Sequence, residues 1–510
     1  VDSRSIVVIA IYYIQLKRKE YLYRQMAKKL LLLLLVVISV SLRYDGTSLA
    51  MAMTTTVSKS GTSSSSTAAS ILSNKKVVVV GGGPVGLYFA ALLLQSDPSV
   101  KIEILEKETK SSSSKNAFGL GVGPRMKHRL QDVPGLYEKA ISVSSTVGGG
   151  LNIPLVSRFD LVENMRNFLL EHYNDSCCRV TLGEGCASAN FDTKTITTDK
   201  GREIQYDLLL GADGVNSQIR RFLTTDNNNN MGEQHYTENV YWKALQLPKQ
   251  TIIEKESFLP IQHPSITGGR VLPKAPEGHF VLLYWKGEQH DRDNNPIGIQ
   301  TVDDWKRILK EGMQEKKKKK ASFVRKFIGL DKGKDSSTDK EFVYDEELLQ
   351  DFVESRSKHS HHLQLERYDY PEGSVALIGD SAHSFNSALG QGCATALECT
   401  HMLVEKCLLS SENNNTLEDA LSKYSELATK ESHAMTDISL VTYGIKGGFN
   451  LMTFKAMPLV LFNMLRGKSL IKRMMDITVP YSTIAKENRR LLKICRRQFE
   501  KERKPFVPKD

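Results

Sequence analysis

Apolar residues occur along this chain in runs of different length and spacing, and the runs predict its elements. Val77–Val80, Leu208–Leu210 and Val375–Ile378 are uninterrupted apolar runs, as expected for strands buried on both faces of a parallel sheet. Residues 236–300 contain further strand patterns that fit an antiparallel sheet, and residues 411–510 are mostly helical in pattern. The chain is therefore predicted to have an α/β fold with an inserted mixed or antiparallel β-sheet and a helical C-terminus.

The first 74 residues predict a targeting leader that lies outside the fold. From Met26, two lysines precede the mostly apolar residues 30–40, too few for a transmembrane helix of about 20 residues. Residues 53–74 are rich in Ser and Thr and contain no acidic residue, as in organelle transit peptides. Together they predict a bipartite leader for delivery to a plastid. The alternatives are a mitochondrion, the endomembrane system, or a signal anchor followed by a linker.

The net charge of +11 is concentrated locally, mainly in Lys316–Lys320 and in the C-terminal residues 486–510. No nucleic-acid module accompanies these runs, so no nucleic-acid partner is predicted. Residues 486–510 also carry apolar side chains at helical spacing, which makes peripheral membrane association through the basic C-terminus a minor hypothesis. The seven cysteines form no CxxC pair, and residues 359–362 are interpreted as a polar loop, so no metal site is predicted.

A glycine-rich turn follows the first apolar run. Gly81, Gly83 and Gly86 form G-x-G-x-x-G between Val77–Val80 and a helical stretch, the arrangement that binds the pyrophosphate of a dinucleotide. Glu106 ends the next strand 20 residues after Gly86, where a carboxylate bonds the ribose hydroxyls of the adenosine. This unit by itself leaves NAD and FAD open.

Two later motifs favour FAD. Asp213 lies in a Gly-Ala-Asp-Gly sequence after an apolar strand, and Asp380 follows Gly379 at the end of another. A strand-end aspartate can bond a ribityl hydroxyl. The turn Gly390-Gln391-Gly392 precedes a helical stretch from residue 393 to 409, and its amides can face the flavin edge where negative charge develops.

The three motifs, in this order and spacing, resemble the class A flavin monooxygenases of the para-hydroxybenzoate hydroxylase-like group. Within that group the chain is most similar to kynurenine 3-monooxygenases, on Phe118–Arg125, Tyr241–Pro248, Glu431–Tyr443 and Val479–Ser482. Arg158 matches the family arginine beside the flavin. The candidate cofactor-binding residues are Gly81, Gly83, Pro84, Val85, Gly86, Glu106, Lys107, Arg125, Arg158, Asp213, Gly379, Asp380, Gly390, Gln391 and Gly392.

The resemblance implies an FAD-dependent monooxygenase that takes hydride from NADPH or NADH and transfers one oxygen atom of O2 to a small organic substrate. Gln391 and Tyr443 are the candidate catalytic residues of the pocket. The family's carboxylate-binding arginine has no counterpart in residues 130–155, and the family's pocket asparagine is Ala394. These departures favour a less polar substrate than kynurenine. The alternatives are an oxidoreductase, epoxidase, reductase or halogenase of the same fold, or a catalytically degenerate flavin-binding protein.

The motifs also predict the domain organisation. The FAD-binding domain is expected in two parts, residues 75–235 and 366–410. Residues 236–365 form the substrate-domain β-sheet with low-complexity insertions, and residues 411–510 form the helical C-terminal region.

Overall fold

A computed structural model of the chain contains two units, Val1–Ser66 and Thr67–Asp510. The described residues all belong to the second unit. They are residues 70–109, 118–147, 153–225, 231–247, 259–273, 278–286, 290–291, 295–296, 298–312, 345–409, 416–441, 456, 458–460, 462–463 and 466–505. The predicted leader up to residue 69 and the lysine-rich insertion at 316–320 lie outside the described residues. The fold begins earlier than residue 75, because Leu72 is buried in the core and Ile71 donates a backbone hydrogen bond to Leu408.

The first sheet has the strand order β18-β19-β10-β1-β2-β6. Its parallel strands are β1 (Lys76–Val80), β2 (Lys101–Glu106), β6 (Cys178–Leu182), β10 (Leu208–Gly211) and β19 (Val375–Leu377), and β18 (Asp369–Tyr370) is antiparallel to β19. The apolar residues of β1 and β10 are buried throughout. The predicted buried parallel sheet is therefore present, because aliphatic side chains on both strand faces need cover from both sides.

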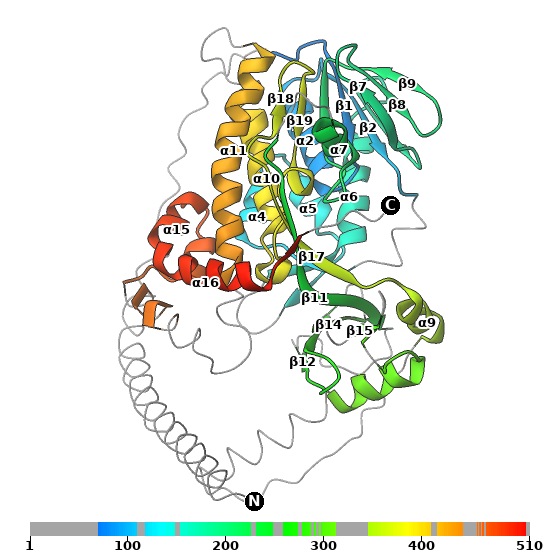
Figure 1. The fold of residues 1–510 in the computed structure, drawn as a ribbon. Coiled ribbons are helices and arrows are strands. Elements are labelled where there is room, and N and C mark those ends of the chain that lie inside the picture. Colours follow the sequence, from blue (N-terminus) through cyan, green and yellow to red (C-terminus); the bar gives the residue numbers. More distant parts are fainter. Residues whose placement is uncertain are drawn as a thin grey trace, which may run out of the picture. The chain divides into compact units, whose positions relative to one another are not determined.

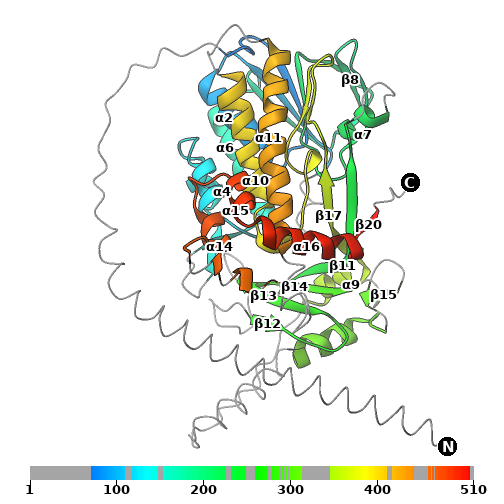
Figure 2. The same cartoon turned by 60° about the vertical axis from the view of Figure 1, so that its left-hand side comes forward.

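Helices pack beside this sheet. They are α2 (Pro84–Ser96), α4 (Pro124–Leu130), α5 (Leu136–Ala140), α6 (Arg158–His172), α7 (Gln218–Thr225), α10 (Gly392–His401) and α11 (Leu417–Ser439). In Figures 1 and 2, α11 runs alongside α10. A capping box between Thr416 and Asp419 fixes the start of α11, since each side chain bonds the other's backbone amide. The helix predicted from 393 to 409 changes after α10 into a π-helical segment, Met402–Leu408.

The second sheet has the order β12-β13-β14-β11-β17. Its antiparallel strands are β12 (Leu259–Ile261), β13 (Gly268–Pro273), β14 (His279–Lys286), β11 (Gln234–Leu247) and β17 (Lys358–Gln364), and β20 (Lys504–Pro505) pairs with β11. Helix α9 (Glu346–Glu354) lies against β11, over a core that includes Trp285 and Trp305. The antiparallel sheet is as predicted. The polar-loop interpretation of residues 359–362 is wrong, because they form part of β17.

Three small groups of strands complete the described sheets. One is β3 (Gly119–Gly121), β5 (Ile153–Ser157) and β4 (Ser144–Val147); a second is β7 (Cys186–Asn190), β8 (Thr195–Thr198) and β9 (Glu203–Gln205); the third is β15 (His290–Asp291) with β16 (Asn295–Pro296). The arrangement is a mixed α/β fold. Apart from the start of the fold, the predicted domain boundaries remain predictions.

The C-terminal region contains α14 (Leu470–Met475), α15 (Tyr481–Glu487) and α16 (Arg489–Glu502), and Figures 1 and 2 draw α15 and α16 near the lower end of α11. The apolar side chains that suggested membrane contact, such as Leu491 and Phe499, are buried against the protein. This burial does not test membrane association through the basic C-terminus, which remains a prediction. Among the described residues, no helix has the length and apolar content needed to cross a membrane.

Candidate functional site

The carboxyl ends of three neighbouring strands bring the three motifs to one edge of the first sheet. The register pairs Val80 of β1 with Gly211 of β10, and Gly211 with Leu377 of β19. The glycine turn begins directly after Val80, the Gly-Ala-Asp-Gly sequence begins at Gly211 itself, and the Gly379-Asp380 motif begins two residues after Leu377. Parallel α/β sheets bind ligands at this edge, so the topology supports the position of the site predicted from the sequence.

The glycine turn after β1 combines one close backbone approach with one open position. Gly81 has φ of +115°, and a Cβ at this position would overlap the carbonyl oxygen of Ala212. Gly83 is the N-cap of α2, and a Cβ there would meet no atom within 4 Å. The amides at the start of α2 carry partial positive charge. Gly81 therefore serves the fold, while Gly83 keeps open the space that a pyrophosphate needs.

Glu106 closes the turn from the end of β2. Its Oε2 accepts the N–H of Gly82 at 2.9 Å, and its Oε1 accepts the N–H of Glu108 at 2.9 Å. These bonds fix the carboxylate beside the turn, where the sequence predicted a ribose-binding group. Lys107 is exposed. Pro84 and Val85 form the first turn of α2.

Asp213 carries an unused acceptor. Its Oδ2 accepts the N–H of Gln218 at 2.6 Å, whereas its Oδ1 is buried and has no hydrogen-bond partner. Desolvation raises the pKa of this carboxyl. A buried polar atom without a partner is rare in a protein, so Oδ1 is suited to a hydroxyl of a bound cofactor.

Arg220 joins the second motif to the third. Its Nη1 donates to the carbonyl oxygen of Ser381 at 2.9 Å, and its Nη2 donates to that of Val215 at 2.7 Å. The Ser381 hydroxyl donates to the carbonyl oxygen of Gly211. The two motifs are thus held as one unit. Arg220 lies seven residues after Asp213, and nothing in the sequence assigned it this role.

Asp380 and Arg158 form the charged part of the site. Both side chains are exposed and make no hydrogen bond with the described residues. Many protein atoms surround the Asp380 carboxyl although solvent still reaches it, so desolvation raises its pKa, and the positive charge of Arg158 opposes this shift. Gly379 has φ of +66° and lies against Val85. The structure therefore brings Arg158, at the start of α6, into electrostatic reach of the Gly379-Asp380 motif; its predicted place beside the flavin remains a prediction.

The turn before α10 presents one buried amide side chain. Gly390 has φ of +64°, and Gln391 is the N-cap of α10. Gln391 is only 5% exposed, and its Oε1 accepts a hydrogen bond from the hydroxyl of Tyr481 at 3.3 Å. A Cβ on Gly392 would meet no atom within 4 Å. The turn therefore leaves room for a flat ligand beside it.

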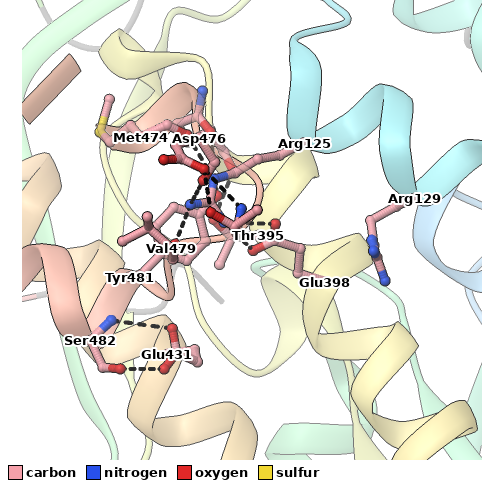
Figure 3. Close-up of polar contacts among 12 residues, drawn as sticks. Arg125, Arg129, Thr395, Glu398, Glu431, Met474, Asp476, Val479, Tyr481 and Ser482 are labelled. Carbon is pink, nitrogen blue, oxygen red and sulfur yellow. Dashed lines mark hydrogen bonds and ion pairs between the residues drawn. The ribbon is translucent and has the colours of Figure 1, made fainter. Parts of the chain in front are cut away.

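Arg125 is engaged by the C-terminal region (Figure 3). Its Nη1 donates to Glu398 at 2.9 Å, its Nε donates to the carbonyl oxygen of Met474 at 2.7 Å, and its Nη2 donates to that of Asp476 at 2.7 Å. Every guanidinium nitrogen thus has a partner within the protein. Direct contact of Arg125 with a cofactor remains a prediction. Sequence reasoning could not find these bonds, since its partners are about 270 to 350 residues away.

A chain of contacts links Arg158 to the second sheet. The backbone N–H of Arg158 donates to the carbonyl oxygen of Phe118 at 2.9 Å, and the Phe118 ring meets Trp242 edge-on at 5.7 Å between centroids. Lys358 Nζ lies 5.4 Å from the Trp242 ring centroid. Desolvation lowers the pKa of Lys358, and the charge of Arg158 adds to this shift. Sequence reasoning missed Lys358 because nothing in its local sequence distinguishes it.

Tyr443, the second candidate catalytic residue, lies outside the described residues. The other predicted site residues fall into two groups. One group lies at or near the sheet edge: the glycine turn, Glu106, Asp213, Gly379, Asp380, Arg158 and the turn at 390–392. The other is Arg125, which binds the C-terminal region. The unpartnered Oδ1 of Asp213 and the open space above Gly83 fit FAD, the cofactor implied by the motifs.

Comparisons with known proteins give remote matches. No family model matches the chain. It is 24% identical over 334 residues to violacein synthase of Chromobacterium violaceum, covering 62% of this chain and 70% of that protein. It is 23% identical over 254 residues to kynurenine 3-monooxygenase of Debaryomyces hansenii, covering 49% of this chain and 47% of that protein. The match thus spans about half the length of the second relative.

The fold also matches a solved structure, that of 2-methyl-3-hydroxypyridine-5-carboxylic acid oxygenase. The TM-score is 0.51 at 18% identity, covering 72% of this chain and 90% of that one. These matches confirm the resemblance to the class A FAD-dependent monooxygenases. The same relatives support an oxidoreductase.

Proposed function

We propose that this oxidoreductase binds FAD and uses NADPH or NADH with O2 to hydroxylate a small aromatic substrate. The observation that carries the proposal is the convergence of the three motifs at one sheet edge. There the glycine turn, the unpartnered Oδ1 of Asp213 and the carboxyl of Asp380 follow adjacent strands. The remote relatives support the same type of reaction.

FAD, when bound, would supply the redox chemistry, and the chain's residues would bind and orient it. The start of α2 would bind the pyrophosphate through its amides. Glu106 would hold the adenosine ribose, and Asp213 and Asp380 would accept hydrogen bonds from hydroxyl groups of the cofactor. Gln391 would face the reacting side of the site from the turn before α10, where it can donate to an oxygen of the substrate or the cofactor.

The second sheet supports an aromatic substrate that carries a negative charge. Phe118 and Trp242 form an aromatic pair, and Lys358 Nζ lies over the Trp242 ring. Arg158 follows the same pair through its backbone bond to Phe118, and its charge reaches Lys358. Neither cation has a hydrogen bond or ion pair with the described residues. A carboxylate on the substrate would provide the missing counter-charge. The missing family arginine had favoured a less polar substrate, whereas Lys358 offers an alternative cation from a different strand.

A reconstitution experiment tests the proposal. Purified protein with added FAD should quench flavin fluorescence, and NADPH or NADH should then reduce the bound flavin. Aromatic acids such as benzoate derivatives should stimulate oxidation of the nicotinamide in air and gain one oxygen atom from labelled O2. Reduction without label in any product would instead favour a reductase or a degenerate flavin-binding protein. Absence of FAD binding would overturn the proposal.

Lys358→Met, with Lys472→Met on α14 as a control outside the aromatic pair, tests the substrate class. The change should raise the KM for an aromatic carboxylate at least ten-fold and leave that for the matching carboxamide unchanged. Equal effects on both would rule out an anionic substrate at this position.

We also propose that the leader directs the protein to a plastid, with a mitochondrion or the endomembrane system as alternatives. The order of a charged, an apolar and a Ser/Thr-rich segment in residues 26–74 supports this proposal.

A further inference from the structure

One face of α10 connects the predicted flavin turn to the C-terminal region. Gln391, Thr395 and Glu398 are spaced at i, i+4 and i+7, so they lie along one side of the helix. Tyr481 contacts the first of them through its hydroxyl, and Arg125 binds the last. Figure 3 shows Thr395 and Glu398 together with Arg125 and Tyr481. The face therefore joins the site to residues 474–482.

Tyr481 is held rigidly from two directions. The guanidinium carbon of Arg125 lies 4.3 Å from the centre of the Tyr481 ring, and Arg125 also binds the carbonyl oxygens of Met474, Asp476 and Val479 just before it. On the other side, the N–H of Ser482 donates to Glu431 at 3.2 Å. Tyr481 is 1% exposed. Its hydroxyl is thus fixed in position before any ligand binds.

Gln391 has one acceptor and one pair of donors in its amide. The acceptor Oε1 takes the Tyr481 hydroxyl, and the backbone oxygen of Gln391 takes the Thr395 hydroxyl at 2.9 Å. No described residue accepts a hydrogen bond from Nε2. A side chain that is 95% buried, with a single unpaired donor group, is ready to donate to a ligand.

We propose that Tyr481 is a positioning residue: its hydroxyl holds Oε1 of Gln391, so that the amide NH2 is directed to the bound cofactor or substrate. Arg125 and Glu398 act through Tyr481, because they anchor the segment that carries it. The C-terminal region thereby completes the site, although its sequence contains no cofactor motif. This inference rests on the proposed function for the identity of the ligand, but the contact itself does not depend on FAD.

A double-mutant cycle tests the proposal. Tyr481→Phe removes the hydroxyl and keeps the ring against Arg125. It should weaken FAD binding, measured by fluorescence quenching, about two- to ten-fold, as expected for one hydrogen bond. In a Gln391→Ala background the same change should have no further effect, because Tyr481 acts through Gln391. Tyr424→Phe is the matched control, since it removes another buried tyrosine hydroxyl, which donates to Leu377 at 2.9 Å.

Hydrogen exchange of the protein without FAD gives a second measurement. Tyr481→Phe should raise exchange in the first turn of α10 several-fold, and Tyr424→Phe should leave that turn unchanged. The inference would be overturned if Tyr481→Phe left hydrogen exchange in the first turn of α10 unchanged. It would also be overturned if Tyr481→Phe still weakened FAD binding in the Gln391→Ala background. If the wild-type protein binds no FAD, the proposed function fails, and the exchange measurement still decides whether Tyr481 orders the turn.

Discussion

The guanidinium group of Arg125 forms an ion pair with Glu398 at 2.9 Å, with side-chain exposures of 3% and 16%. This contact joins α4 to α10. Desolvation raises the pKa of Glu398, and the charge of Arg125 opposes that shift. The carboxylate therefore depends on its partner to stay ionised in a poorly hydrated position. The same guanidinium holds the C-terminal segment, so one side chain connects three regions of the fold.

Arg125→Met is expected to destabilise the protein by about 3–5 kcal/mol, because Glu398 is left as a buried charge without a partner. Urea denaturation measures the change. The double variant Arg125→Met with Glu398→Gln should recover part of the loss. Arg129→Met, also on α4, breaks the ion pair with Asp132 just beyond the helix and should lower the stability less. If Arg125→Met lowers the free energy of unfolding no more than Arg129→Met does, the ion pair of Arg125 with Glu398 contributes little to stability.

Gly83→Ala is expected to weaken FAD binding, whereas Gly81→Ala is expected to lower the stability of the protein. The methyl group at position 83 meets open space in the protein alone, so the variant should fold with an unchanged Tm and bind FAD at least ten-fold more weakly. At position 81 the methyl group would overlap backbone atoms, and φ is +115°. That variant should therefore lose stability even without FAD. Thermal melts with and without FAD distinguish the two, and normal FAD binding by Gly83→Ala would contradict the assigned turn.

His361 predicts a dependence of stability on pH. Burial, aided by the neighbouring histidines and Arg220, lowers the pKa of His361 to about 3, below the value near 6.5 expected in the unfolded chain. Between these values the unfolded state binds the extra proton, so stability rises from pH 3 to 6.5 and is lost on acidification. The loss is at most about 1.4 kcal/mol per pH unit.

His361→Gln should flatten this dependence, because glutamine can keep the contact with His235, which lies 3.0 Å from His361. Urea denaturation between pH 7 and 5 measures the slope. His172→Gln, on α6, is the control and should leave the slope as in the wild type. Equal slopes for His361→Gln and the wild type would show that His361 does not contribute to the pH dependence of stability.

The leader prediction concerns residues 26–74, which carry the charged, apolar and Ser/Thr-rich segments. A fluorescent protein fused to these residues should accumulate in plastids of an algal host. A fusion to residues 53–74 alone, without the apolar segment, should fail to enter the secretory route. A cytosolic signal from the longer fusion would contradict the prediction of a leader.

The sequence by itself determined the glycine turn, the strand-end aspartates and the turn at 390–392, because each motif depends on a short stretch of backbone beside an apolar strand. It also predicted both sheets, through the spacing of apolar residues. It failed at residues 359–362, where polar side chains suggested a loop, because β17 is paired with β11 and pairing depends on backbone groups rather than side-chain polarity.

Only the tertiary structure decided which distant side chains complete the site. Tyr481 reaches Gln391 across 90 positions of sequence, and Arg125 reaches Val479 across 354. Lys358 meets Trp242 through the register of two antiparallel strands. Local sequence carries no signal for such contacts, because they result from how helices and sheets pack once their apolar faces are buried.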